Sequence, residues 1–161
     1  MKKLINIMTG IAIMAIAAVS CTKDNDIHTN SIDPVLVGEW HLLGMKAEDS
    51  SLSQVNTDVY LDLRGDGTFE LYQKTDSQSV RYDRYTGRCW SEDGILTGIY
   101  SDGKPWGAKY EYAMTLDGFI LRSYNLIEEQ RYVRAEIPEN VRSEANTVDT
   151  RSVQASGSPI L

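Results

Sequence analysis

The alternation of apolar and polar residues constrains the fold of this chain more than any other feature. Between Trp40 and Ile137, apolar side chains recur at every second position of several segments, as at Val59, Leu61 and Leu63. A period of two places successive side chains on opposite faces of an extended strand. No amphipathic helical pattern of useful length interrupts this alternation, so the sequence predicts an all-β domain.

Turn sequences that contain glycine divide this region into short strands. Gly65-Asp66-Gly67 predicts a tight hairpin, and Asp117-Gly118 predicts another reversal. About eight strands are expected, over residues 38–46, 58–64, 68–73, 80–90, 95–100, 108–116, 119–124 and 129–137. Short strands at nearly even spacing are typical of an antiparallel sandwich or barrel. We predict an eight-stranded up-and-down barrel, because closure removes the exposed strand edges.

Residues 1–20 have the pattern of a secretory signal peptide. Met1-Lys2-Lys3 is positively charged, and residues 4–19 are almost entirely apolar. A helix over residues 4–19 would be roughly 24 Å long, which is shorter than the roughly 30 Å hydrocarbon core of a membrane. The pattern therefore predicts a signal helix that is removed, rather than a permanent membrane span.

Ala18-Val19-Ser20-Cys21 resembles the lipobox of bacterial lipoproteins, in which the cysteine becomes the first residue of the mature chain. The resemblance implies cleavage before Cys21, a diacylglycerol on its thiol and an acyl chain such as palmitate on its amine. Two or three acyl chains hold a protein stably on a membrane. The alternative is an ordinary signal peptide followed by a coincidental cysteine.

The residues after Cys21 bear on the location of the protein. Position 22 is Thr and not the Asp that marks retention at the inner membrane, and Lys23-Asp24-Asn25-Asp26 resembles the surface-export signals of Bacteroidota-type lipoproteins. These resemblances imply a lipid-anchored protein of the outer membrane. Display at the cell surface and display toward the periplasm both stay open.

The aromatic residues mark the folded part of the chain, because all of them lie between Trp40 and Tyr132. We divide the chain into a signal peptide (1–20), a lipidated flexible tether (21–33), a barrel domain (34–138) and a tail that we expect to be disordered (139–161). With Cys21 lipidated, Cys89 is the one thiol left in the sequence. No intramolecular disulfide is therefore expected.

The residues that carry chemistry do not form a recognisable catalytic or metal site. The two histidines, His28 and His41, are not paired with further ligands at a metal-site spacing. Residues 62–67 resemble a calcium loop only superficially, because Arg64 stands at its third position. Cys89 is expected to be a small buried residue rather than a reactive thiol. We expect a non-enzymatic protein without a metal or cofactor, and the formal charge of −7 argues against a nucleic-acid partner.

Nine tyrosines and three tryptophans in a barrel-sized domain can either line a cavity or fill the interior. Flat apolar faces with polar rims suit a lipid, sterol, bile-acid-like or sugar ligand. Trp106 lies in a turn-rich loop, where it either folds over the mouth of the barrel or contacts a partner. The candidate ligand-binding residues are Tyr82, Tyr85, Tyr100, Trp106, Tyr110, Tyr112 and Met114.

Gly38-Glu39-Trp40 at the start of the first strand resembles the Gly-x-Trp motif of lipocalins. Together with the hairpin at 65–69 and the closing segment 132–138, residues 34–138 are similar to the lipocalin-like domains of Bacteroidota lipoproteins. The resemblance implies that Trp40 closes the base of the barrel, with Arg131 or Arg134 packed over it. We expect such a barrel to bind a small hydrophobic or amphipathic ligand. The alternative is a filled barrel that serves as a protein-interaction module for an unidentified partner.

Overall fold

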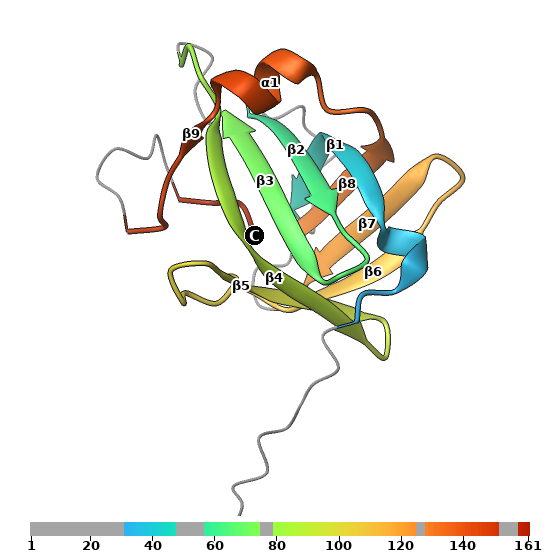
Figure 1. Cartoon of the computed structure of the whole chain (residues 1–161). Coiled ribbons are helices and arrows are strands. Elements are labelled where there is room, and N and C mark those ends of the chain that lie inside the picture. The colour runs from blue at the N-terminus through green and yellow to red at the C-terminus, as the bar shows by residue number, and fades with distance from the viewer. Residues whose placement is uncertain (1–30, 48–56, 75–78, 125–127, 152–157) are drawn as a thin grey trace, which may run out of the picture.

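Eight antiparallel strands follow one another around a closed barrel (Figure 1). The computed structural model describes residues 31–47, 57–74, 79–124, 128–151 and 158–161. The barrel strands are β1 Gly38–Ala47, β2 Asp58–Leu63, β3 Thr68–Lys74, β4 Asp83–Glu92, β5 Ile95–Tyr100, β6 Tyr110–Met114, β7 Gly118–Ser123 and β8 Glu128–Arg134. Each strand pairs with the next in sequence, and β1 also pairs with β8, with Trp40 opposite Arg134. The predicted all-β up-and-down barrel is therefore confirmed.

The observed strands differ most from the predicted ones where the alternation is weakest. β4 begins at Asp83 rather than at residue 80, and β6 is shorter at both ends than the predicted 108–116. β8 ends at Arg134 rather than at residue 137. After Arg134 the chain leaves the barrel, and Ile137 is buried in a second apolar cluster outside it.

The wall between β4 and β5 is only partly paired. β5 pairs with Gly87–Glu92 of β4, whereas Asp83 and Arg84 pair with the short parallel strand β9 (Asn146–Thr147). β9 therefore occupies the edge of β4 that β5 leaves free. Residues from far along the chain thus complete the wall at this place.

The main core lies inside the barrel. The inward positions of β2, β3 and β4 are fully buried, as at Leu61, Leu71 and Cys89. Aromatic rings pack edge to face in this core, with the Phe69 ring centroid 5.2 Å from that of Trp106 and 5.6 Å from that of Tyr100. Edge-to-face pairs contribute stability beyond the area that they bury.

A short 3-10 helix, η1 (Pro34–Leu36), lies across one end of the barrel and buries Leu36 completely. The Asp33 side chain caps it by accepting a hydrogen bond from the Val35 N–H at 3.1 Å. Ile32 is also buried, so packing begins slightly before the predicted domain boundary at residue 34. Cys21 and the predicted signal helix lie outside the described residues. Among those that the structure does describe, no helix has the length and apolar composition needed to cross a membrane.

Residues 139–151 and 158–161 differ from the disordered tail that we predicted over 139–161. Helix α1 (Glu139–Glu144) packs on the outside of the barrel through Val141, which lies with Ile137 and Tyr72 in the second cluster. Arg142 adds an ion pair to Glu39 of β1, with an N–O distance of 2.8 Å. A helix of six residues with one buried apolar side chain is too short to produce a periodic signal in the sequence.

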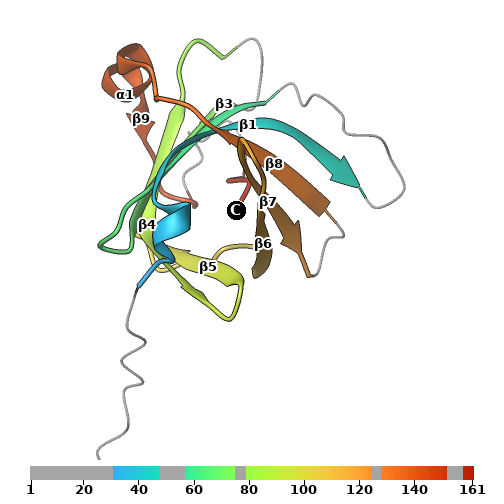
Figure 2. The ribbon, with the colours of Figure 1, turned by 90° about the vertical axis from the view of Figure 1, so that its right-hand side faces the viewer.

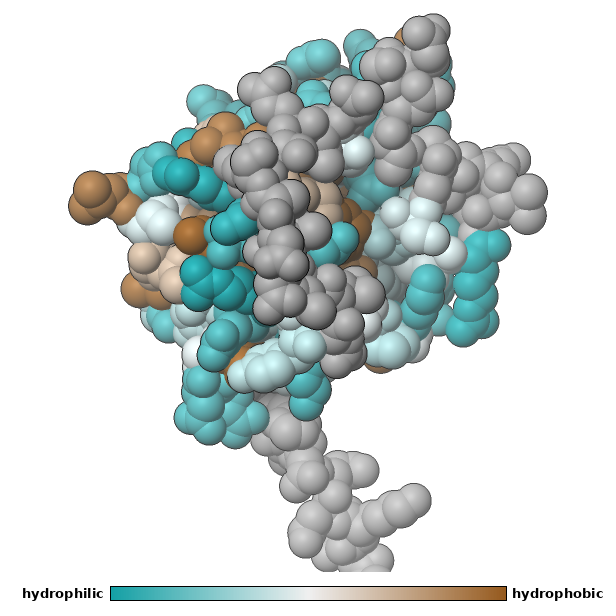
Figure 3. Space-filling view, turned by 180° about the vertical axis from the view of Figure 1, so that it is seen from behind, coloured by the Kyte–Doolittle hydropathy of each residue, from teal (hydrophilic) through white to brown (hydrophobic). Residues whose placement is uncertain are grey.

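Exposed hydrophobic residues are scattered over the face that Figure 3 shows. On the face opposite to that of Figure 1, hydrophobic residues form separate spots between hydrophilic ones (Figure 3). The most exposed large apolar side chain is that of Leu116, in the turn between β6 and β7. Single exposed apolar residues of this kind are normal on a globular domain.

Replacing Gly118 with alanine is expected to destabilise the barrel by about 1–3 kcal/mol or more. A Cβ at this position would lie 1.9 Å from the backbone oxygen of Tyr132, so β7 would have to move away from β8. Gly107 is the matched control, because a Cβ there meets no atom within 4 Å. Urea unfolding of both variants tests this, and an equal loss for Gly118→Ala and Gly107→Ala would contradict it.

Candidate ligand site inside the barrel

Aromatic side chains from three adjacent strands line one side of the barrel interior. Tyr85 of β4, Tyr100 of β5 and Tyr110 of β6 are all at most 3% exposed. Burial raises the pKa of Tyr85 and of Tyr110 to about 12, and it raises the pKa of Tyr100 further. These hydroxyls therefore stay protonated near neutral pH and act as hydrogen-bond donors.

The segment Ser158–Leu161 enters the barrel from an exposed Ser158 to a buried Leu161, although it is not part of the wall. The end of the chain, marked C, stands within the ring of strands both in Figure 1 and in the view turned by 90° (Figure 2). Leu161 is 3% exposed and belongs to the main core cluster. The hydroxyl of Tyr100 donates to the backbone oxygen of Leu161 at 2.7 Å, and that of Tyr110 donates to the backbone oxygen of Ile160 at 3.3 Å.

Two buried glutamines complete the polar contacts of this segment. Gln73 of β3 donates from Nε2 to the Ser158 carbonyl at 2.9 Å, and its Oε1 accepts from the Ile160 N–H at 2.9 Å. Gln130 of β8 donates from Nε2 to the Ile160 carbonyl at 3.3 Å, while its Oε1 accepts from the Tyr132 hydroxyl at 2.9 Å. A buried amide without partners costs about 1–3 kcal/mol. Three of these four hydrogen bonds of Gln73 and Gln130 are therefore made with Ser158 and Ile160, and one is made with a residue of a barrel strand.

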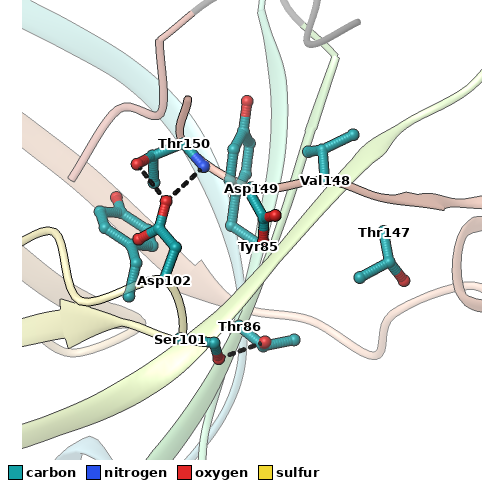
Figure 4. A pocket seen from close by; sticks show the side chains of 9 residues that line it. Tyr85, Thr86, Ser101, Asp102, Thr147, Val148, Asp149 and Thr150 are labelled. Carbon is teal, nitrogen blue, oxygen red and sulfur yellow. Dashed lines mark hydrogen bonds between the residues drawn. The ribbon is translucent and has the colours of Figure 1, made fainter. Parts of the chain in front are cut away.

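A small cavity lies where β5 leaves β4, beside Tyr85 and Tyr100 (Figure 4). Its volume is about 120 Å³, and Thr147–Thr150 form its other side. Asp102 holds the segment Thr147–Thr150 against the barrel wall. Its carboxylate accepts hydrogen bonds from the Thr150 N–H at 2.9 Å and from the Thr150 hydroxyl at 2.5 Å. The Thr150 hydroxyl is the main cause of the lowered pKa of Asp102. The residues after α1 thus cover the gap in the wall as well as entering the interior.

At one end of the barrel, Arg134 packs over the buried ring of Trp40. The guanidinium carbon of Arg134 lies 4.2 Å from the ring centroid of Trp40, and the Trp40 indole donates to the Leu36 carbonyl at 2.8 Å. Gly38 has a φ of 141°, and a Cβ there would lie 2.3 Å from an Arg134 nitrogen. The second candidate, Arg131, instead pairs with Asp117 at 3.2 Å. Arg134 is therefore the residue over Trp40.

Two of the predicted lining residues do not line the interior. Tyr82 packs with the second cluster outside the barrel, and its hydroxyl donates to Asp58. It is three positions from the inward-facing Tyr85, and an odd separation on an extended chain reverses the face. Met114 is 45% exposed, because it lies at the end of β6 beside the turn to β7.

Tyr112 takes an intermediate position, whereas Trp106 is buried. Tyr112 is partly buried against the core, and its hydroxyl donates to Asp33 at 2.8 Å, at the same end as η1. Trp106 is 5% exposed, with its ring beside those of Phe69 and Tyr110. The loop of Trp106 folds back on β5, so this ring belongs to the core and is not displayed for a partner.

The interior glutamines and the segment Ser158–Leu161 are the parts of the site that we did not predict. A signal for the glutamines was present, because Gln73 continues the inward positions Phe69 and Leu71 on the same strand. A polar residue at an inward position calls for a partner inside the barrel. The sequence contained no comparable signal for where Ser158–Leu161 would pack.

Cys89 and His41 are the other two potentially reactive side chains that the sequence analysis considered. Burial raises the pKa of Cys89 to about 12, which leaves the thiol protonated and unreactive near neutral pH. His41 lies on the outside, with its Nε2 2.8 Å from Asp58 and its ring stacked on Tyr60. No group of three His, Cys, Asp or Glu side chains among the described residues is placed to hold a metal ion.

No protein-family model matches the chain, and no curated protein matches it. Among solved structures, it is similar to a lipoprotein YedD from Klebsiella pneumoniae subsp. pneumoniae, with a TM-score of 0.42 and 14% sequence identity. That similarity covers 68% of this chain and 80% of the Klebsiella chain.

Proposed function

We propose that this chain is a lipid-anchored, non-enzymatic protein of the outer membrane whose lipocalin-like barrel binds a small hydrophobic or amphipathic ligand. The anchor is a diacylglycerol on Cys21, and residues 22–30 connect it to the packed domain. The acidic run after Cys21 favours display at the cell surface. The protein acts by holding its ligand, without a cofactor.

The observation that carries this proposal is the way in which Ser158–Leu161 sits in the interior. The barrel encloses the Leu161 side chain and packs against Ile160, while Gln73, Tyr110 and Tyr100 donate hydrogen bonds to the backbone oxygens of Ser158, Ile160 and Leu161. Apolar walls with a few convergent polar groups are the usual composition of a ligand site. The interior therefore has the chemistry of a binding site for an amphipathic molecule of similar size.

The contact of Trp40 with Arg134 supports the lipocalin-like part of the proposal. It closes one end of the barrel with a fully buried ring and a guanidinium group above it. A barrel of eight strands is wide enough to hold one small ligand when its interior is not filled by its own side chains.

The alternative function also has an observation in its favour. Ser158–Leu161 fills the space that a ligand would occupy, as expected for a closed barrel that acts as a protein-interaction platform. The buried position of Trp106 removes the contact residue that we first considered for such a partner. The two functions differ in whether the interior accepts a molecule from solution.

Native mass spectrometry with lipid and bile-acid extracts tests the proposal on the chain from residue 21 onward, with Cys21→Ser to prevent lipidation. We expect an adduct of one ligand per chain. Tyr110→Phe should reduce its affinity by about 2- to 12-fold, the contribution of one hydrogen bond. Tyr124→Phe, at a 65% exposed position, is the matched control and should leave the adduct unchanged. A bare mass in every extract, also after Ile160→Ser and Leu161→Ser loosen the inner segment, would favour the platform.

A further inference from the structure

The side chain of Gln73 contacts the inner segment as a neighbouring strand would. Its amide accepts from the N–H of Ile160 and donates to the carbonyl of Ser158, two residues earlier. In an extended chain these two groups lie on the same edge, because the backbone repeats every two residues. An ionised fatty acid has no donor for the Gln73 oxygen, and the single hydroxyl of a sterol cannot meet both ends of the amide, whereas a peptide offers an N–H and a carbonyl at the required spacing. The Gln73 amide therefore suits a peptide better than a simple lipid.

The other polar groups of the interior continue this arrangement along the segment. Tyr110 and Gln130 both donate to the Ile160 carbonyl, and Tyr100 donates to the backbone oxygen of Leu161. Donors from β5, β6 and β8 thus reach the backbone oxygens of the consecutive residues Ile160 and Leu161. Because these contacts go to the backbone, they do not depend on which side chains the peptide carries.

The side chains of the segment pass from outside to inside. Ser158 is exposed, Ile160 is partly buried against the core, and Leu161 is 3% exposed within it. The interior therefore provides an apolar space for a Leu-sized side chain at the inner end of a short extended peptide.

We propose that the barrel interior is a binding site for a short peptide with apolar residues at its inner end, and that Ser158–Leu161 occupies this site as an internal competitor. This inference rests on the proposed function and specifies its ligand class. A segment joined to its own site competes at a high effective concentration, on the order of millimolar. A peptide from another protein binds only when it displaces Ser158–Leu161.

The test compares the chain from residue 21 onward, carrying Cys21→Ser, with the same chain carrying Ile160→Ser and Leu161→Ser. The probe is the peptide acetyl-Gly-Ser-Pro-Ile-Leu, and binding is measured by calorimetry. We expect the loosened variant to bind the peptide at least about tenfold more tightly than the chain with its native segment, because the competitor is weakened. Leu116→Ser, which makes the same change at a fully exposed leucine, is the matched control and should behave like the parent chain.

Gln73→Leu in the loosened variant separates a peptide site from a general apolar site. It should weaken the peptide at least about tenfold, since two hydrogen bonds are lost, and should change lauric acid binding by no more than about twofold. Equal peptide affinity with and without the native segment would overturn the internal competition. Binding of lauric acid without any binding of the peptide would overturn the ligand class and leave the proposed function standing. If neither probe binds to either chain and the mass also stays bare in every lipid and bile-acid extract, the proposed function itself fails.

Thermal unfolding tests peptide binding to the loosened variant, which carries Ile160→Ser and Leu161→Ser, even if that variant is only partly folded. A peptide that fills the interior should raise its unfolding midpoint with increasing peptide concentration. The peptide Leu-Ile-Pro-Ser-Gly, with the reversed sequence, should not. A midpoint that does not depend on the concentration of acetyl-Gly-Ser-Pro-Ile-Leu would overturn the proposal.

Discussion

Replacing Trp40 with alanine is expected to lower the free energy of unfolding by about 3–5 kcal/mol, the range for a large buried aromatic side chain. The ring is 1% exposed, and its centroid lies 4.7 Å from that of Phe119 in an edge-to-face contact. The substitution also leaves the Leu36 carbonyl without the indole donor that it has at 2.8 Å. Loss of the ring therefore opens a cavity where η1 closes the barrel.

Chemical denaturation measures the loss of unfolding free energy in Trp40→Ala. Alanine variants of Arg134 and Arg131 are measured for comparison. Arg134→Ala removes the guanidinium over the Trp40 ring and should cost about 0.5–2 kcal/mol. Arg131→Ala removes an exposed ion pair with Asp117 and should cost no more than about 1 kcal/mol. A loss below about 1 kcal/mol for Trp40→Ala would show that this end of the barrel does not depend on the ring. An Arg131 effect larger than the Arg134 effect would contradict the assignment of Arg134 to the motif.

The barrel could be predicted from the sequence because its strands are amphipathic over their whole length. Val59, Leu61 and Leu63 face the interior and are all fully buried, as their alternation required. The glycine-containing turns separated these strands at nearly the right residues. Local patterning and tertiary packing agree in this part of the chain, so the pattern is a sufficient guide.

The candidate site was less predictable, because the pattern reports which face is inward and not what fills the space. Tyr85, Tyr100 and Tyr110 lie inside the barrel, whereas Tyr82, three residues before Tyr85, packs outside it. A strict use of the two-residue period excludes Tyr82 from the interior. Gln73 is a buried polar residue at an inward position, which indicates that it has a hydrogen-bond partner but not which one.

The inner segment could not have been predicted by the same reasoning. Ser158–Leu161 has two apolar residues, which is too few for any period to be recognised. Its position depends on contacts with residues 30 to 87 positions away, including Gln73, Tyr100 and Gln130. Such contacts follow from the space left by the closed barrel and not from local preference.

Raising the pH above 10 is expected to unfold the barrel through its interior tyrosines. Burial raises the pKa of Tyr85 and Tyr110 to about 12, and it also raises the pKa of Tyr100 and Tyr132. In the unfolded chain a tyrosine ionises near pH 10. Because the folded pKa lies above the unfolded one, the stability from these groups is fully present below pH 10 and falls as the pH rises toward the folded pKa.

The slope of this loss is large, since each tyrosine that ionises only in the unfolded state removes about 1.4 kcal/mol per pH unit. Four such residues together remove roughly 5 kcal/mol per pH unit, against a typical total stability of 5–15 kcal/mol. Circular dichroism and the tyrosinate absorbance at 295 nm, followed together from pH 8 to 12.5, measure the effect. We expect the absorbance of the interior tyrosines to rise together with the loss of structure.

Tyr110→Phe is the variant that isolates one tyrosine. It should reduce the slope of stability against pH by about 1.4 kcal/mol per unit above pH 10, at the cost of the hydrogen bond to Ile160 below that pH. Ionisation of all the tyrosines near pH 10 with the structure intact would contradict the prediction, because it would mean that water reaches the interior hydroxyls. The same result would show that Ser158–Leu161 does not seal the site, so the alkaline titration also examines the packing on which the peptide proposal depends.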